Sequence, residues 1–173
     1  MEIHQYVRSI KQGRPHVLFA VTLDNGDKSK YTGHLDNLKG TDLTTYFEII
    51  RKHKLNEINA RTDVLISEGW VHTDPDTQTK YTFLSTPQDQ RNWIMRAIQM
   101  LMGNDLTGAT FRAKGATYTF RSNADASAAM FGLLSIEAAV NSGAELKDRV
   151  LTLTLAGSPA DAANTLNSVV DPR

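Results

Sequence analysis

The sequence contains one pattern twice: a pair of short strand-like segments around a polar turn, followed by a helix with a marked start. The first copy covers residues 70–102 and the second covers residues 109–141. Aromatic and β-branched residues occur between polar ones in each pair of segments, which indicates a hairpin with one buried face. Thr86 before Pro87 in the first copy, and Asn123 in the second, favour the start of a helix. Because an isolated hairpin is not stable in water, these hairpins must pair with each other, with another hairpin of the chain or with a second copy.

A third hairpin is predicted near the N-terminus. Residues 16–23 form an apolar and β-branched run that stops before Asn25-Gly26, and residues 30–35 follow the turn. Asn-Gly tolerates the positive φ angles of a tight hairpin turn, so this is the strongest strand signal in the sequence. The second of these strands has few apolar residues, which favours a separate docking element over a part of the core.

Apolar residues recur at three- and four-residue spacing between Gly40 and Gly69, which predicts a long amphipathic helix. Lys54 interrupts the apolar stripe, so a kink is allowed there. Gly69 ends the helix, because glycine readily adopts the left-handed conformation that follows a last helical turn. The helix of the second copy is rich in alanine, and we expect an interruption at Ser142-Gly143 with a further helix after it.

Together these elements predict a helix-rich α+β protein with an N-terminal β-hairpin, a long helix, two β-hairpin-helix units and a short C-terminal helix. We expect three segments. Residues 1–39 form a hairpin that acts as a docking arm, residues 40–156 contain the long helix and the two hairpin-helix units, and residues 157–173 form a tail helix. Because so short a helix is marginal in water, we expect Leu166 and Val169 to be exposed or docked on a partner.

Charge and composition argue against several classes of protein. Nineteen basic residues balance 19 acidic ones, so the chain lacks the positive charge with which nucleic-acid-binding proteins collect phosphates, and a nucleic-acid partner is not expected. The absence of cysteine excludes disulfides and thiolate metal sites. No segment approaches the roughly 20 apolar residues of a membrane-spanning helix, so we expect no membrane partner.

No residue pattern indicates catalysis, a cofactor or a metal. Alternating side chains in the first polar turn resemble the start of a calcium loop, namely His72, Asp74, Asp76 and Gln78. Counted from Asp74 as the first position, Thr79 and Ser85 stand where such a loop needs a glycine and a carboxylate, so a solvated turn is the better interpretation. The five histidines lack the three- or four-residue spacing of a zinc site, and no Gly-x-Ser-x-Gly elbow is present.

The aromatic side chains of the two hairpins, with arginines beside them, would suit a stacking platform for bases or sugars. Aromatic residues at this periodicity more often belong to a core. The two hairpin-helix units and the tail supply a candidate interaction surface, which consists of Trp70, Tyr81, Arg91, Arg112, Arg121, Leu166 and Val169.

Several short motifs follow one another in a defined order. They are Ile58-Asn59-Ala60-Arg61-Thr62-Asp63, Gly69-Trp70, Tyr81-Thr82-Phe83-Leu84-Ser85-Thr86 with Asp89-Gln90, Phe111-Arg112-Ala113 with Gly115 and Tyr118, and Leu146-Lys147. Over residues 56–150 this order resembles a family of short phage proteins and tail-protein C-terminal domains of unknown function, encoded near tail-fibre genes. The chain departs from the family pattern at Thr62, which separates Arg61 from Asp63, and at Asp89, where a serine is common.

The resemblance implies a structural protein of the virion, a building block or adaptor of the tail or tail-fibre region. Such a protein contacts other virion proteins, forms homo-oligomers and has no catalytic residues to transfer. Two other classes stay open: a head decoration or fibre-attachment protein, and a carbohydrate- or nucleic-acid-binding module that uses Trp70, Tyr81 and nearby arginines. A metal-dependent enzyme built on His72, Asp74 and Asp76 is the most remote alternative.

Overall fold

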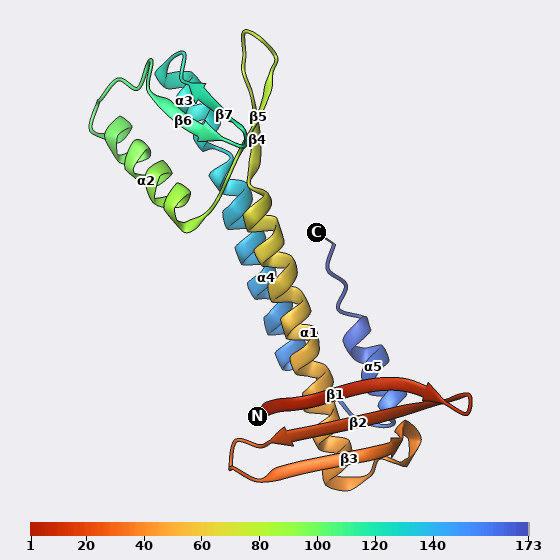
Figure 1. Ribbon diagram of the computed structural model, residues 1–173. Helices are drawn as coiled ribbons and strands as arrows, with labels where there is room; N and C mark the ends of the chain where they lie inside the picture. Colours follow the sequence, from red (N-terminus) through yellow and green to blue (C-terminus); the bar gives the residue numbers. More distant parts are fainter. Residues whose placement is uncertain (173) are drawn as a thin grey trace. The chain divides into compact units, whose positions relative to one another are not determined.

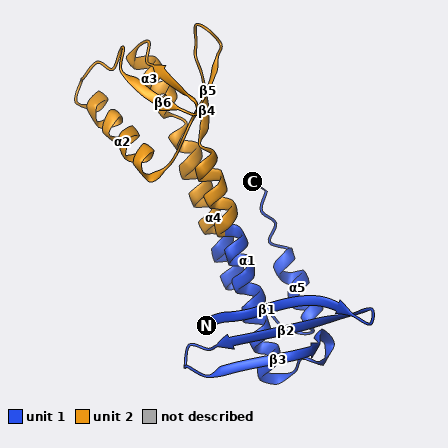
Figure 2. Cartoon of the chain, viewed as in Figure 1, with its two compact units in different colours: residues 1–58, 146–172 blue, residues 59–145, 173 orange. Residues whose placement is uncertain are grey.

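The structure, a computed structural model, describes residues 1–172 and confirms the predicted α+β class (Figure 1). Two compact units make up this part of the chain. The first unit contains residues 1–58 and 146–172, and the second contains residues 59–145 (Figure 2). The chain passes from one unit to the other within two helices, α1 (Gly40–Glu68) and α4 (Leu133–Thr152). Arg173, the last residue of the expected tail segment, lies outside the described residues.

The first unit contains a three-stranded antiparallel sheet in the order β1-β2-β3. Its strands are β1 (Glu2–Lys11), β2 (Arg14–Thr22) and β3 (Lys28–His34). Strands β2 and β3 are the predicted N-terminal hairpin, and β1 is an addition that the sequence did not indicate. A register shift between Ile3 and Gln5 breaks the alternation of apolar and polar residues in β1, which hides the strand signal.

The sheet of the first unit packs on helices from both ends of the chain. The short helix η1 (Leu35–Asn37), the start of α1 and helix α5 (Pro159–Asn167) complete this core. The buried side chains are Val17, Phe19, Val21, Leu35, Leu38, Tyr46, Phe47, Ile49 and Ala162. Residues 1–39 and the described tail therefore share one core with α1, so the observed division differs from the arm, middle and tail that the sequence suggested.

The second unit contains a four-stranded antiparallel sheet in the order β4-β5-β6-β7. Its strands are β4 (Trp70–Thr73), β5 (Lys80–Phe83), β6 (Thr110–Ala113) and β7 (Ala116–Thr119). These are the two predicted hairpins. They pair with each other, because Phe83 lies opposite Ala113 and the backbone N–H of Lys114 donates to the Thr82 carbonyl at 2.8 Å.

The helix starts follow local chemistry, with one correction. Helix α2 (Pro87–Leu101) begins after Thr86, whose side chain accepts from the Asp89 backbone in a capping box. The sequence suggested Asn123 as the cap of helix α3 (Asn123–Met130). In the structure Ser122 caps this helix. The Asn123 side chain instead accepts a hydrogen bond from the Leu106 backbone N–H at 2.7 Å, so a long-range contact occupies the oxygen that a capping bond would need.

Helix continuity also differs from the prediction. Helix α1 runs unbroken through Lys54, and α4 runs unbroken through Ser142-Gly143, where an interruption was expected. The break falls instead at Phe131-Gly132, between α3 and α4. A Cβ atom at Gly132 would lie 1.8 Å from Cδ1 of Trp70, so only glycine lets the chain turn this close to the indole ring.

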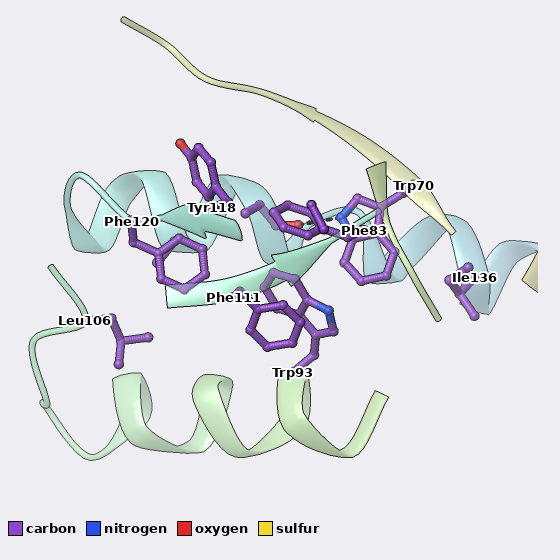
Figure 3. Close-up of a cluster of buried hydrophobic side chains, with 11 residues drawn as sticks. Trp70, Phe83, Trp93, Leu106, Phe111, Tyr118, Phe120 and Ile136 are labelled. Carbon is purple, nitrogen blue, oxygen red and sulfur yellow. Dashed lines mark hydrogen bonds between the residues drawn. The ribbon is translucent and has the colours of Figure 1, made fainter. Parts of the chain in front are cut away.

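The core of the second unit is an aromatic cluster between α2, the sheet and α3, seen at close range in Figure 3. Trp93 of α2 stacks on Phe111 of β6 with ring centroids 3.7 Å apart, and Phe83 lies edge-on to both rings. The Trp70 indole N–H donates to the Ala129 carbonyl at 2.8 Å. The aromatic side chains of the hairpins are therefore core residues, which is the reading that the periodicity favoured.

Candidate interaction surface

Three of the residues predicted for an interaction surface are buried within their own unit. Trp70 is 6% exposed, Leu166 is 3% exposed and Val169 is 2% exposed. Trp70 belongs to the aromatic core of the second unit, and the other two pack with Ile58 and Val150 in the first unit. Their burial corrects the prediction, because apolar side chains near the end of a chain looked free in the sequence and are covered by α1 and α4.

The four other predicted surface residues have different neighbours. Tyr81 is half-buried and its ring packs against the ring of Tyr118 with centroids 4.8 Å apart. The three arginines are exposed and bind different partners: Arg91 donates to Gln88, Arg112 lies 3.5 Å from Asp89, and Arg121 lies 2.9 Å from Asp74.

The polar turn between β4 and β5 is organised by its own carboxylate. Oδ1 of Asp74 accepts the backbone N–H groups of Asp76 at 2.9 Å and Thr77 at 3.0 Å, while Oδ2 accepts from the Arg121 guanidinium. The bond from Thr77 is the main cause that lowers the pKa of Asp74 to about 2, with Arg121 adding to it and burial opposing it. Within residues 1–172, no group of three or more histidine or acidic side chains is arranged to hold a metal ion.

A buried polar network joins β4, β7 and α3 beside this turn. Asp125 accepts from the Tyr118 hydroxyl at 2.7 Å and from the Arg121 backbone N–H at 2.9 Å. His72 Nε2 lies 2.9 Å from the same carboxylate, and since a carboxylate only accepts, the histidine donates through this nitrogen. Burial, followed by the hydrogen bond to Asp125, raises the pKa of the Tyr118 phenol. The network is satisfied inside the unit and holds two strands to a helix.

An exposed apolar surface covers α2 and the junction of α3 with α4. We define it by five side chains, which are Ile94, Ile98, Leu101, Phe131 and Leu134. The first three lie on one face of α2 because they are four and three residues apart. Leu101 is 87% exposed and Phe131 is 66% exposed, and both line a hollow of about 490 Å³.

The sequence contained a signal for this apolar surface that the prediction did not use. Trp93, Ala97 and Met100 already give α2 one apolar face, and Trp93 is fully buried on it. Ile94, Ile98 and Leu101 form a second apolar stripe. The two stripes together make the apolar surface of α2 wider than a contact with one core requires.

A polar hollow of about 650 Å³ lies on another side of the second unit. It is lined by α2 and β6, and its side chains include Gln88, Asn92, Arg96, Gln99 and Arg112. Arg96 donates to Gln99 at 2.9 Å and Gln88 donates to Asn92 at 3.0 Å. These groups leave amide and guanidinium donors along the wall, which is a surface suited to polar ligands.

Among the described residues, no helix is long and apolar enough to cross a membrane. The comparisons with known proteins add no assignment. No protein-family model matches the chain, and searches of curated proteins and of solved structures find no significant match.

Proposed function

We propose that this chain is a bacteriophage virion structural protein, a building block or adaptor of the tail or tail-fibre region that acts through protein contacts. The observation that carries the proposal is the exposed apolar surface of Ile94, Ile98, Leu101, Phe131 and Leu134. The resemblance of residues 56–150 to phage proteins encoded near tail-fibre genes supports a place in the tail or tail-fibre region. The protein works in the assembled virion, in multiple copies, and its task there requires no catalytic step.

The chemistry of the apolar surface fits a protein partner. Large contiguous apolar patches on a folded protein mark sites of association, because covering apolar surface with a partner removes it from water and lowers the free energy. None of the side chains that line the hollow beside Leu101 and Phe131 is charged. Depletion of charge at the centre is typical of protein interfaces. The apolar surface binds another virion protein or a second copy of this chain.

Particle fractionation tests the location. We expect mass spectrometry of purified particles, separated into heads and tails, to find the chain in the tail fraction. A signal confined to heads would instead select the decoration or fibre-attachment alternative. A chain that stays monomeric in the host cytosol and is absent from purified particles would overturn the proposal.

Substitutions test the apolar surface itself. We expect Leu101→Gln combined with Phe131→Gln to abolish incorporation into particles without lowering thermal stability, since both side chains are mainly exposed. Val71→Gln is the matched control, because Val71 is also an exposed apolar residue of the second unit and lies on β4, outside the apolar surface. Normal incorporation of the double variant would show that this surface is not the contact.

A second candidate function, carbohydrate binding, is favoured by the polar hollow on α2 and β6. Trp70 is buried and Tyr81 is half-buried against Tyr118, so the hollow with Arg96 and Arg112 is the surface to test. A glycan array with the native chain and an Arg112→Ala variant would support it through binding that the variant loses. Salt-dependent DNA binding, measured in parallel, tests the nucleic-acid alternative, and no binding in either assay removes both.

A further inference from the structure

The first unit contains a hollow with an unusual set of polar groups. It has a volume of about 320 Å³ and is lined by β1, by the part of α1 that belongs to the first unit, and by α5. Tyr6 and Arg8 come from β1, Tyr46 and Lys54 from α1, and Asn167 from the end of α5. Pockets that hold small molecules start at about 300 Å³, so the hollow suits a ligand of few atoms.

Tyr46 is the first group that points to a ligand. Its side chain is 0% exposed, and apart from a weak interaction with the Tyr6 phenol its hydroxyl has no hydrogen-bond partner within residues 1–172. Burial, with the Tyr6 phenol adding to it and Arg8 opposing it, raises the pKa of Tyr46 to about 12, so the group remains a neutral O–H donor at neutral pH. A buried donor without an acceptor costs free energy, because it has lost its water and gained nothing in return.

Arg8 is the second group. It lies two residues from Tyr6 on β1, so the two side chains project from the same face of the strand. No acidic side chain within residues 1–172 lies within ion-pair distance of its guanidinium, whereas Glu57 on the same hollow lies 3.7 Å from Lys54 and 3.5 Å from His53. The hollow therefore combines a guanidinium without an ion-pair partner and a buried hydroxyl donor without a good acceptor.

We propose that this hollow binds a small oxyanion, a carboxylate or a phosphate group, through the Arg8 guanidinium and the Tyr46 hydroxyl. A guanidinium presents a planar fork of N–H donors that matches the paired oxygens of either group. The Tyr46 hydroxyl supplies one more donor from the wall. An oxyanion supplies the acceptor that this buried hydroxyl lacks, and a cation or a purely apolar ligand does not.

Titration of the full chain with two probe anions tests the proposal. Glutarate represents the carboxylate and inorganic phosphate represents the phosphate, each compared with chloride at the same ionic strength. We expect a saturable shift in the backbone NMR signals of β1, α1 and α5 with at least one probe. Saturation by glutarate alone identifies a carboxylate site, and saturation by phosphate alone identifies a phosphate site.

Two substitutions assign the binding groups. We expect Tyr46→Phe and Arg8→Gln each to weaken binding at least about tenfold, the typical loss when a charge-assisted hydrogen bond is removed. Two controls remove the same chemistry elsewhere in the first unit. Tyr31→Phe loses a hydroxyl that donates to the His34 carbonyl at 2.9 Å, and Arg14→Gln loses an exposed guanidinium of β2, so both should bind as the native chain does.

Two results would overturn the proposal. One is the absence of saturable binding for both probes. The other is binding that survives unchanged in Tyr46→Phe and Arg8→Gln, which would place the anion elsewhere on the protein. Tyr46→Phe keeps the buried ring, so a folded variant is expected, and its unfolding temperature in anion-free buffer serves as the check.

Discussion

Each of the two units buries a tyrosine, and the two hydroxyl groups differ in what surrounds them. In the second unit, the Tyr118 hydroxyl donates to Asp125, which also accepts from His72 and from the Arg121 backbone. In the first unit, the Tyr46 hydroxyl has no partner among the described residues beyond a weak interaction with the Tyr6 phenol. A network in which every polar group has a partner holds strands to a helix, and that structural role accounts for it. A buried donor without a partner adds nothing to the fold, which is why we assign it to binding.

The largest expected effect comes from removing the acceptor that the network shares. Asp125→Ala leaves the Tyr118 hydroxyl and the His72 ring nitrogen buried without their acceptor, and it should lower the free energy of unfolding of the second unit by about 3 kcal/mol. Hydrogen exchange of the amides of β4 to β7, compared with those of β1 to β3, measures the change unit by unit. Asp161→Ala is the control, because Asp161 has the same capping position in α5 but is exposed. A smaller loss for Asp125→Ala than for Asp161→Ala would contradict the role of the network.

Removal of one donor should have an intermediate effect. Tyr118→Phe deletes the hydroxyl and leaves Asp125 with its other partners, so we expect destabilisation by about 1 to 2 kcal/mol. Denaturant unfolding followed by near-ultraviolet circular dichroism reports on the aromatic core around Tyr118. A neutral result would mean that Tyr118 and Tyr46 do not differ energetically, and the comparison between the units would fail.

The contribution of Asp74 to stability can be tested by lowering the pH. The folded state holds the pKa of Asp74 at about 2, below its usual 3.8, so protonation favours the unfolded chain. This contribution to stability is complete above pH 4 or so and disappears as the pH falls through about 2. Thermal unfolding across this pH range should show the loss in the native chain and not in Asp74→Asn. Parallel curves for the two proteins would mean that Asp74 does not contribute.

The smallest expected effect is at Tyr46. Tyr46→Phe removes a buried hydroxyl whose protein contact is a weak one with the Tyr6 phenol, so in anion-free buffer the unfolding temperature should stay the same or rise slightly. Differential scanning calorimetry of this variant beside Tyr118→Phe sharpens the comparison directly. A drop as large as that of Tyr118→Phe would show that the Tyr46 hydroxyl is already satisfied in the free protein.

Much of the local structure could be predicted from the sequence. The turn at Asn25-Gly26, the cap at Thr86 and the helix end at Gly69 lie where the residue types placed them. At Gly69 the reason is twofold: its φ is +70°, and a Cβ atom would lie 1.8 Å from the Phe83 carbonyl oxygen. Such signals are readable because a turn or cap depends mainly on residues a few positions apart.

The candidate interaction surface was less predictable. Apolar residues at helical spacing look the same in the sequence whether they face a core or solvent. Leu166 and Val169 are buried under α1 and α4, while Leu101 and Phe131 have no cover from the described residues. The difference depends on which distant element packs against each helix, and no local pattern records it.

The sequence by itself determined the class of the fold, the three predicted hairpins and helix ends such as those at Gly69 and Thr86, because these follow from backbone preferences and short-range hydrogen bonds. Only the tertiary structure decided which polar groups meet. Asp125 gathers Tyr118 from seven residues away and His72 from 53 residues away. Tyr46 lies beside Arg8 of β1 around a hollow that α5 completes. The packing of distant segments decides such partners. Burial removes water, so a buried polar group can bond only to the groups that packing places beside it.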